Sequence, residues 1–367
     1  MNTPIRILYI NGGTMDMGGI SSYMMNYYRH FDKDVVQIDF VVHGKGGVYD
    51  EEIRSYGGNV FHIPTKKDNF LENIKQLKKI MKNGNYQIVH SHMDGMNGLA
   101  LKLAKDSGIK VRISHSHNTS HLTNNKIKRA VHELIRKTIP RYATQLWACS
   151  DAAGKWLYGN KEFKVIPNAI NISKFEFDIE VRNAVRKKLQ IEDKYIIGHI
   201  GKFEYQKNHD FLISIFADIV YQNPSATLVL VGDGSRRKNI EEKVRDLKLA
   251  DKVIFLGQRT DVDKLFNIFD VFVLPSNFEG LPVVAVEAQA NGLKCVCAST
   301  ITEEINVTGN VTFIGLNDSV EKWESTICKR QQRDDTAPIK VANRGYSILI
   351  ESRKLEKEYI NLVRKAN

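Results

Sequence analysis

Short runs of β-branched and other apolar residues alternate along the chain with longer segments whose apolar residues recur every three to four positions. The short runs predict strands, and segments such as Phe70–Lys82 and Met96–Ser107 predict helices between them. Strands alternating with helices indicate a parallel sheet covered on both faces. The first series of predicted strands is Ile5–Asn11, Val36–Val42, Val60–Ile63, Gln87–His90 and Lys110–Ser114.

The same rhythm begins again after a polar segment that follows Val165–Ile170. The second series of predicted strands is Tyr195–Gly201, Thr227–Gly232, Val253–Leu256, Val271–Leu274 and Lys294–Ala298. Two such series predict two doubly wound α/β domains, at residues 1–170 and 171–345. Residues 346–367 predict a helix, because their apolar positions fall close to one face.

Composition places the protein among ordinary globular chains. The 367 residues are 42% hydrophobic and 26% charged, and no apolar run approaches the ~20 residues of a membrane span. Four cysteines without a metal-binding spacing, and a start without a signal-peptide pattern, favour a cytoplasmic protein. The net charge of +11 falls almost entirely within residues 1–170, which carry +10. Such asymmetry indicates an anionic partner for the first domain.

Ligands bind parallel sheets at the carboxyl ends of their strands, so the residues after each strand are the candidates for chemistry. Asn11 to Ile20 form a glycine-rich loop before a helix that Ser21 or Ser22 is expected to cap. The loop lacks the spacing of a dinucleotide fingerprint, and the chain has no Walker A motif. Further along, two strands end in His-x-His, at His90/His92 and His115/His117. These histidines suit a structural role, an active-site imidazole or, less well, a metal.

The second half carries the sharper signals. Lys202 and Lys207 flank a strand-to-helix turn and could clamp a diphosphate. After the strand Val271–Leu274, Pro282 suits a first helical turn, so backbone N–H groups from Gly280 onward would form a phosphate seat. Glu279 lies beside that seat, and Glu287 is about a turn and a half into the helix, where it could bind ribose hydroxyls. By contrast, Asp261-Val262-Asp263 is interpreted as a helix N-cap rather than a metal site.

These motifs together resemble the retaining glycosyltransferases of family four, which have the GT-B fold. The pair Glu279/Glu287 carries most of the resemblance. The other matches, over roughly residues 5–305, are Met17-Gly18-Gly19, the strand-end histidines, Ile166-Pro167-Asn168, Gly201-Lys202 with Lys207-Asn208, Leu230 to Gly234, Val253 to Gly257, and Asp270 to Ser276. The resemblance implies two Rossmann-like domains facing across a cleft, with the C-terminal helix crossing back to the first domain.

The resemblance also implies roles for single residues. The C-terminal domain would bind the donor: Lys202 and Lys207 its diphosphate, Glu287 its ribose, and Glu279 the transferred sugar. Gly19 would approach the diphosphate from the other domain, and His117, or His115 in the alternative alignment, would face the sugar. Catalysis is assigned to His117, Glu279, Lys202 and Lys207. The remaining donor contacts are assigned to Gly18, Gly201, Gly232, Leu256, Gly257, Gln258, Gly280, Leu281 and Pro282.

The function implied is transfer of a hexose from a nucleotide diphosphate sugar, with UDP favoured, to a glycan or lipid-linked acceptor for capsule or exopolysaccharide. No metal and no cofactor are expected, and nucleic acid is excluded because the basic half lacks aromatic stacking positions and known motifs. The alternatives are a nucleotide-sugar epimerase and a non-catalytic nucleotide-sugar or glycan-binding protein. The basic segment 124–141 has one apolar face and suits the inner surface of a cell membrane.

Overall fold

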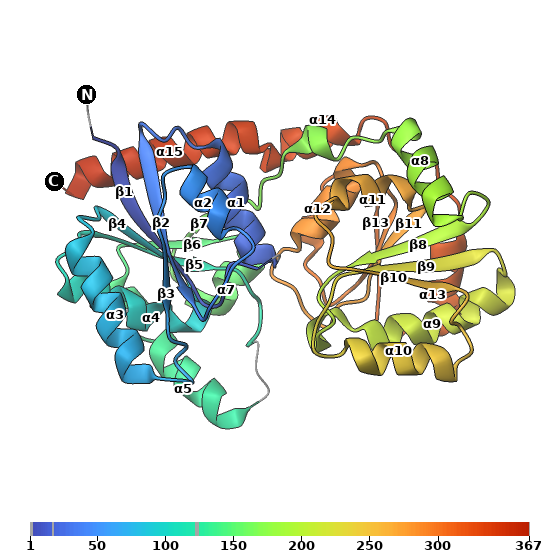
Figure 1. Cartoon of the computed structure of the whole chain (residues 1–367), viewed down its shortest axis with the longest axis horizontal. Coiled ribbons are helices and arrows are strands. Elements are labelled where there is room, and N and C mark those ends of the chain that lie inside the picture. Colours follow the sequence, from blue (N-terminus) through green and yellow to red (C-terminus); the bar gives the residue numbers. More distant parts are fainter. Residues whose placement is uncertain (1–2, 17, 122–124, 367) are drawn as a thin grey trace. The chain divides into compact units, whose positions relative to one another are not determined.

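The computed structural model describes residues 3–16, 18–121 and 125–366. The chain forms two compact units, one made of Met1–Ala169 with Ile348–Asn367 and the other of Ile170–Ser347 (Figure 1). Met17, Asn124 and Asn367, which belong to the predicted glycine loop, basic segment and last helix, lie outside the described residues.

The first unit is built on a parallel sheet of seven strands in the order β3-β2-β1-β4-β5-β6-β7. Its strands are β1 Ile5–Asn11, β2 Val36–His43, β3 Val60–Ile63, β4 Ile88–His92, β5 Val111–Ser116, β6 Gln145–Ala148 and β7 Lys164–Val165. Its helices are α1 Gly19–His30, α2 Asp50–Ser55, α3 Phe70–Asn83, α4 Asn97–Asp106, α5 Lys126–Arg136, α6 Ile139–Tyr142, α7 Asp151–Tyr158 and α15 Ile348–Ala366, with a short 3-10 helix η1 at Asp94–Met96.

The second unit repeats the plan with six parallel strands in the order β10-β9-β8-β11-β12-β13. Its strands are β8 Tyr195–Ile200, β9 Ala226–Val231, β10 Val253–Gly257, β11 Val271–Leu274, β12 Cys295–Ala298 and β13 Val311–Ile314. Its helices are α8 Ile179–Leu189, α9 His209–Gln222, α10 Arg237–Asp246, α11 Val262–Ile268, α12 Val283–Ala290, α13 Val320–Cys328 and α14 Ala337–Val341, with short helical segments η2 Ile172–Lys174, η3 Tyr205–Lys207, η4 Glu303–Ile305 and η5 Ala342–Tyr346.

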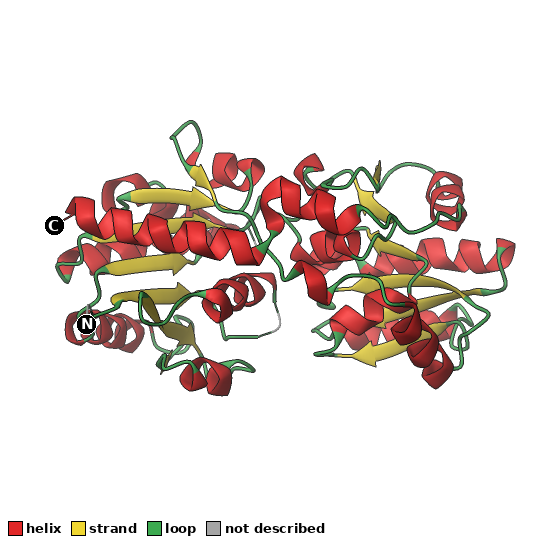
Figure 2. Cartoon of the chain, turned by 90° about the horizontal axis from the view of Figure 1, so that it is seen from above, coloured by secondary structure: helices red, strands yellow, loops and turns green. Residues whose placement is uncertain are grey.

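The C-terminal helix α15 belongs to the first unit, although that unit's other elements end near residue 169. In Figure 2 the helix that ends at the C-terminus lies over the strands of this unit and runs roughly along them. Its buried face packs into the core around β1 and α1, through Ile348, Leu355, Tyr359 and Leu362. The predicted crossing of this helix back to the first domain is confirmed.

Two local predictions were wrong at helix starts. Neither Ser21 nor Ser22 caps α1, because the helix already begins at Gly19 with Gly18 as its N-cap residue. The Gly18 N–H donates to the Asp16 carboxylate at 2.8 Å, but α1 has no side-chain cap bond at this end. In the second unit, Pro282 precedes the first turn of α12 instead of forming part of it.

Candidate functional site

The strand order of the second sheet fixes where a ligand edge lies. β8 and β11 are neighbours, and the connections that leave them continue to opposite sides of the sheet, toward β9 and toward β12. Such a switch point opens a crevice at the carboxyl ends of the two strands. The segments that start there are Gly201 to Lys207 after β8, and Pro275 to Pro282 after β11. They contain half of the donor-site residues that the sequence predicts.

Lys207 and Glu279 form an ion pair at this edge. The Lys207 ammonium is 2.7 Å from Glu279 Oε1, and their side chains are only 15% and 7% exposed. Ser276 Oγ also donates to Oε1 at 2.7 Å, and Gln206 Nε2 donates to Oε2 at 3.0 Å. Because both carboxylate oxygens accept hydrogen bonds, the side chain of Glu279 is held in one orientation. The structure therefore brings two of the predicted residues into direct contact.

Close backbone approach explains the glycines of this edge. Gly232 has a φ of +134°, and a Cβ there would be 2.1 Å from the carbonyl oxygen of Gly201. A Cβ on Gly201 would lie 3.0 Å from the Lys207 side chain. The Gly232 N–H donates to the Gly257 carbonyl at 2.8 Å, which joins the ends of β9 and β10. The missing side chain at Gly201 thus leaves room for Lys207 to pack against the strand end, and that at Gly232 leaves room for the Gly201 backbone.

Glu287 lies on α12, five residues into the helix. Burial, with a smaller contribution from the Asp263 carboxylate, raises its pKa to about 7. A carboxyl group whose pKa is this far from its ordinary value is typical of a functional position. The Gly280 and Leu281 backbone before the helix is buried, as expected for a segment packed against the strand end.

The other predicted donor residues are spread along the same sheet edge. Lys202 is the second residue after β8 and is exposed. Leu256 and Gly257 end β10, two strands from β8, and Gln258 follows them in an exposed loop. Asp261 precedes α11 as predicted, but its carboxylate makes no cap bond. Instead, the Arg259 guanidinium donates to both carboxylate oxygens of Asp261, at 2.8 and 2.6 Å.

In the first unit, the predicted histidines form one buried cluster. His90 and His92 on β4, His115 on β5 and His117 just beyond β5 are 0, 0, 0 and 7% exposed. His117 follows the strand end, whereas His115 lies inside the sheet. This position favours His117 over His115 as the residue that meets a ligand. Burial lowers the pKa of His117 to about 3, so its imidazole is neutral at physiological pH. Gly19, the predicted diphosphate contact, has open space where a Cβ would be.

Sequence reasoning missed three polar residues that orient the predicted ones. Asp94, just after β4, accepts from the backbone N–H of His117 at 2.7 Å and from Asn118 Nδ2 at 2.6 Å. Gln206 and Ser276 hold Glu279, as described above. All three lie within three residues of a strand end or of a predicted site residue, which is the signal that could have identified them.

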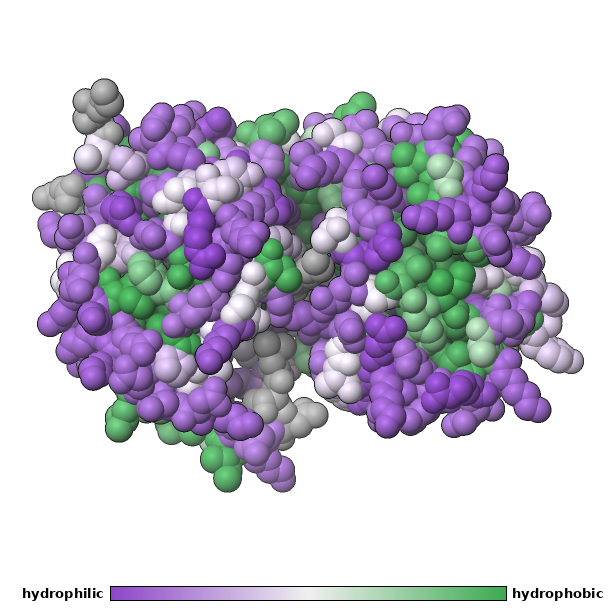
Figure 3. Space-filling model, in the orientation of Figure 1, coloured by the Kyte–Doolittle hydropathy of each residue, from purple (hydrophilic) through white to green (hydrophobic). Residues whose placement is uncertain are grey.

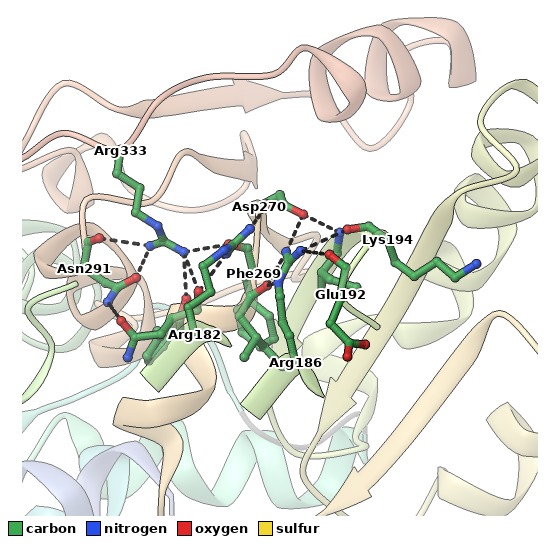
Figure 4. Close-up of polar contacts among 12 residues, drawn as sticks. Arg182, Arg186, Glu192, Lys194, Phe269, Asp270, Asn291 and Arg333 are labelled. Carbon is green, nitrogen blue, oxygen red and sulfur yellow. Dashed lines mark hydrogen bonds and ion pairs between the residues drawn. The ribbon is translucent and has the colours of Figure 1, made fainter. Parts of the chain in front are cut away.

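A second charged cluster in the second unit is structural (Figure 4). Arg182 and Arg186 of α8 both pair with Asp270, at 2.5 and 2.7 Å. The guanidinium of Arg333 donates to the carbonyl oxygens of Asn291, Phe266, Asn267 and Phe269, at 2.7 to 3.2 Å. Burial, ahead of repulsion from Arg182, lowers the pKa of Arg333 to about 9. Since these guanidiniums bind backbone carbonyls and Asp270, we interpret the cluster as structural: it stabilises the backbone at the C-terminal end of α11.

Known proteins support the same picture. Residues 17–174 match the family described as Glycosyltransferase Family 4, and residues 181–324 match Glycosyl transferases group 1. The chain is 37% identical to "Putative glycosyltransferase EpsF" of Bacillus subtilis, covering 88% of this chain and 87% of that one. It is 26% identical to an Escherichia coli protein named "UDP-Gal:alpha-D-GlcNAc-diphosphoundecaprenol alpha-1,3-galactosyltransferase", over 68% and 67% of the two chains.

Among solved structures, the fold is similar to that of HepE from Anabaena in complex with UDP and glucose. The TM-score is 0.79 at 18% identity, over 97% of this chain and 100% of that chain. Two parallel Rossmann-like units with this strand order and these relatives define a GT-B glycosyltransferase. The chain belongs to glycosyltransferase family 4, and its activity is glycosyl transfer in polysaccharide biosynthesis.

Proposed function

We propose that the protein is a retaining, metal-independent hexosyltransferase that uses a nucleotide diphosphate sugar, with a UDP-sugar favoured. The observation that carries this proposal is the Lys207–Glu279 pair, fixed by Ser276 and Gln206 at the switch point of the second sheet. A lysine there can stabilise the negative charge that develops on a departing diphosphate, and an oriented carboxylate can accept hydrogen bonds from sugar hydroxyls. Lys202, at the same strand end, would add a second cation.

Two relatives support the choice of donor. HepE binds UDP and glucose in its crystal structure, and the E. coli relative is named for UDP-galactose and an acceptor on diphosphoundecaprenol. By likeness to them, the acceptor proposed here is a glycan or lipid-linked oligosaccharide. Glu287, on the helix that follows the Glu279 loop, would accept hydrogen bonds from the ribose hydroxyls of the nucleotide.

The proposed transfer proceeds on the face of the sugar from which the diphosphate leaves. The acceptor hydroxyl forms the new bond to the anomeric carbon as the bond to the diphosphate oxygen breaks. The departing diphosphate takes the acceptor's proton, so no separate base is needed. Lys202 and Lys207 stabilise the developing negative charge, and preorganised cations lower the barrier without reorganising during the reaction. His117, whose ring is neutral, would donate to or accept from a sugar hydroxyl.

The test combines nucleotide binding with product analysis. UDP, GDP, ADP and NAD are each added to the wild type, to Glu287→Ala and to the exposed control Glu303→Ala. A ligand at ~100 times its dissociation constant stabilises by about 2.7 kcal/mol. We expect UDP to raise the melting temperature of the wild type and of Glu303→Ala but not of Glu287→Ala. NMR of the product then gives the anomeric configuration. Stabilisation by NAD alone, an inverted product or an epimerised free nucleotide sugar would refute the proposal.

We also propose that the first unit binds the anionic inner surface of the cell membrane through α5. None of the side chains of α5 is buried, and Ile127, Val131 and Leu134 are 77, 45 and 66% exposed along one face. The exposed cations Lys126, Lys128, Arg129, Lys137 and Arg141 lie on or near this helix. Figure 3 shows hydrophobic atoms among hydrophilic ones at the lower end of this unit, where Figure 1 labels α5. An exposed apolar stripe flanked by lysines suits an anionic interface.

Within the described residues, no helix has the length and apolarity needed to cross a bilayer. Attachment would therefore depend on the surface of α5. We expect the protein to sediment with anionic vesicles, and the bound fraction to fall steeply between 50 and 300 mM salt. Salt screens the attraction between the lysines and the anionic lipids. Leu134→Asp should abolish it, whereas Leu71→Asp, which changes an 80% exposed leucine on α3, should not. Binding that is equal for neutral and anionic vesicles would contradict the proposal.

A further inference from the structure

Four imidazoles form a compact layer inside the first unit. The ring centroids of His90 and His92 are 4.1 Å apart with the rings tilted by 33°, and His115 and His117 stack at 4.3 Å. Across the strands, His90 Nε2 and His115 Nδ1 are 3.0 Å apart, and His92 Nδ1 and His117 Nε2 are 2.8 Å apart. The i, i+2 spacing on two neighbouring parallel strands places all four rings on one face of the sheet.

One set of tautomers satisfies these hydrogen bonds. If His90, His92 and His115 each carry their proton on Nδ1, His90 donates to the Tyr359 hydroxyl at 2.9 Å, His115 to His90, and His92 to His117. In this set the Nε2 atoms of His92 and His115 keep a free lone pair, whereas His90 Nε2 accepts from His115, a hydrogen bond that metal binding would replace. Neutral imidazole with one free lone pair is the form that binds metals.

Some polar atoms of this layer have no hydrogen-bond partner within the described part of the chain. They are His92 Nε2, His115 Nε2 and the hydroxyl of Tyr23, all buried. The Tyr23 ring packs against His92, His115 and His117, with centroids 5.0 to 5.8 Å apart. Buried polar atoms normally have a partner, because leaving one without costs about 1–3 kcal/mol. One bound species that interacts with all three atoms would remove this cost.

We propose that His90, His92 and His115 bind a divalent transition-metal ion, with Zn²⁺ as the best match. One ring nitrogen from each histidine lies within 4.8 Å of the others. Tetrahedral zinc with bonds of about 2.0–2.1 Å needs nitrogens about 3.4 Å apart, so small ring rotations complete the site. Nitrogen ligands without carboxylates select zinc, copper or nickel over magnesium or calcium. Tyr23, as phenolate, or a hydroxide would supply the fourth ligand and reduce the buried charge.

The hydrogen bonds around the three histidines match what a metal site needs outside its ligands. A metal-bound histidine usually donates its second N–H to a fixed acceptor. Here His90 would donate to Tyr359 of α15, and His92 to His117. The ion would therefore tie β4, β5 and the C-terminal helix together within the first unit. The ion would be separate from the lysine cations proposed for sugar transfer, although its ligand His92 contacts His117. Metal content is measured without any transfer assay, so failure of one proposal is distinguishable from failure of the other.

The test measures zinc binding by the whole untagged chain. The protein is refolded with Zn²⁺, because a buried site exchanges slowly, and its metal content is determined after dialysis. We expect one ion per chain and a melting temperature several degrees above that of the chelator-treated protein. His115→Asn and His92→Asn should each abolish both effects. His199→Asn, which changes a buried histidine of the second unit, and His121→Asn should retain them.

Cobalt substitution keeps the proposal testable if the histidine variants do not fold. Wild-type protein refolded with Co²⁺ should show the strong visible absorption of tetrahedral coordination. A wild type without bound metal under these conditions would overturn the proposal. Binding that survives His115→Asn but is lost in His121→Asn would also overturn it, because the ion would then lie near α5.

Discussion

The Lys207 Nζ atom lies 2.7 Å from Glu279 Oε1 at the edge of the second sheet where its strands end, and both side chains are largely shielded from water. A pair in this position is costly to break from one side, because the remaining charge stays buried. Lys207→Met should therefore destabilise the protein by about 3–5 kcal/mol. The double variant Lys207→Met/Glu279→Gln should recover part of that loss. Urea unfolding of the four members of the cycle measures the coupling.

The exposed pair Lys322–Asp318, with N and O 2.6 Å apart, is the matched control. Because solvent screens such pairs, Lys322→Met should cost no more than about 1 kcal/mol. Equal losses for the Lys207 and Lys322 variants would mean that the site pair is as weak as a surface pair.

Glu287 should make nucleotide binding depend on pH. Only the ionised carboxylate accepts hydrogen bonds from both ribose hydroxyls, and its pKa is raised to about 7. The affinity for UDP should therefore weaken as the pH falls below 7, by up to about tenfold per unit for one linked proton. Titration calorimetry from pH 6 to 8 measures this slope. Glu287→Gln should bind weakly with a flat profile, whereas Glu303→Gln should keep the wild-type slope.

The same group should act on stability in the opposite direction. Because the pKa of Glu287 is higher in the folded protein than in the unfolded chain, the folded state binds more protons between pH 4.5 and 7. Its contribution to stability is therefore present at low pH and is lost as the pH rises through 7, at most about 3 kcal/mol. Without ligand, Glu287→Gln should be more stable than the wild type at pH 8 and about equal at pH 5. Urea unfolding at both values checks the sign.

Local patterns predicted the strands well and the caps less well. β1, β3 and β11 have the predicted bounds, because β-branched runs between polar residues define a buried strand without reference to the rest of the chain. Strands β6 and β13 were missed, although they have four residues each, as β3 and β11 do. At α1, Gly18 occupies the N-cap position without a side-chain cap bond, although two serines follow within four residues.

Contacts between distant segments could be predicted only in part. The sequence indicated that Lys207 and Glu279 share a sheet edge, since both follow strands of one parallel sheet. It could not show that Gln206 and Ser276 hold Glu279, nor that Tyr359 reaches His90 across 269 positions. Such pairs depend on strand order and helix packing, which local periodicity does not encode. The roles of the predicted site residues in catalysis stay predictions.

Asp94 should be needed for the conformation of the segment after β5. Its φ is +45°, and its carboxylate binds the backbone N–H of His117 and the Asn118 side chain. Asp94→Ala loses both bonds and keeps a strained backbone, so we expect a loss of about 3 kcal/mol. Asp94→Asn tolerates the positive φ and retains one acceptor, so about half of that loss is expected. Thermal and urea unfolding measure both.

Asn85→Ala isolates the backbone contribution, because Asn85 is exposed with a φ of +50°. It should cost about 1 kcal/mol. If Asp94→Ala costs no more than Asn85→Ala, the hydrogen bonds to the His117 segment contribute nothing to stability.

Tyr359 should couple the last helix to the strand that carries His90. Its hydroxyl is 2.7 Å from that of Tyr9 and 2.9 Å from His90 Nδ1, and the side chain is fully buried. Tyr359→Phe keeps the ring packing but removes a partner from two buried polar groups, so we expect a loss of about 1–3 kcal/mol. Tyr221→Phe, at an 85% exposed position, should change stability by less than about 0.5 kcal/mol. Hydrogen exchange should show faster opening of β4 in Tyr359→Phe, and unchanged protection there would mean that α15 is held by apolar packing alone.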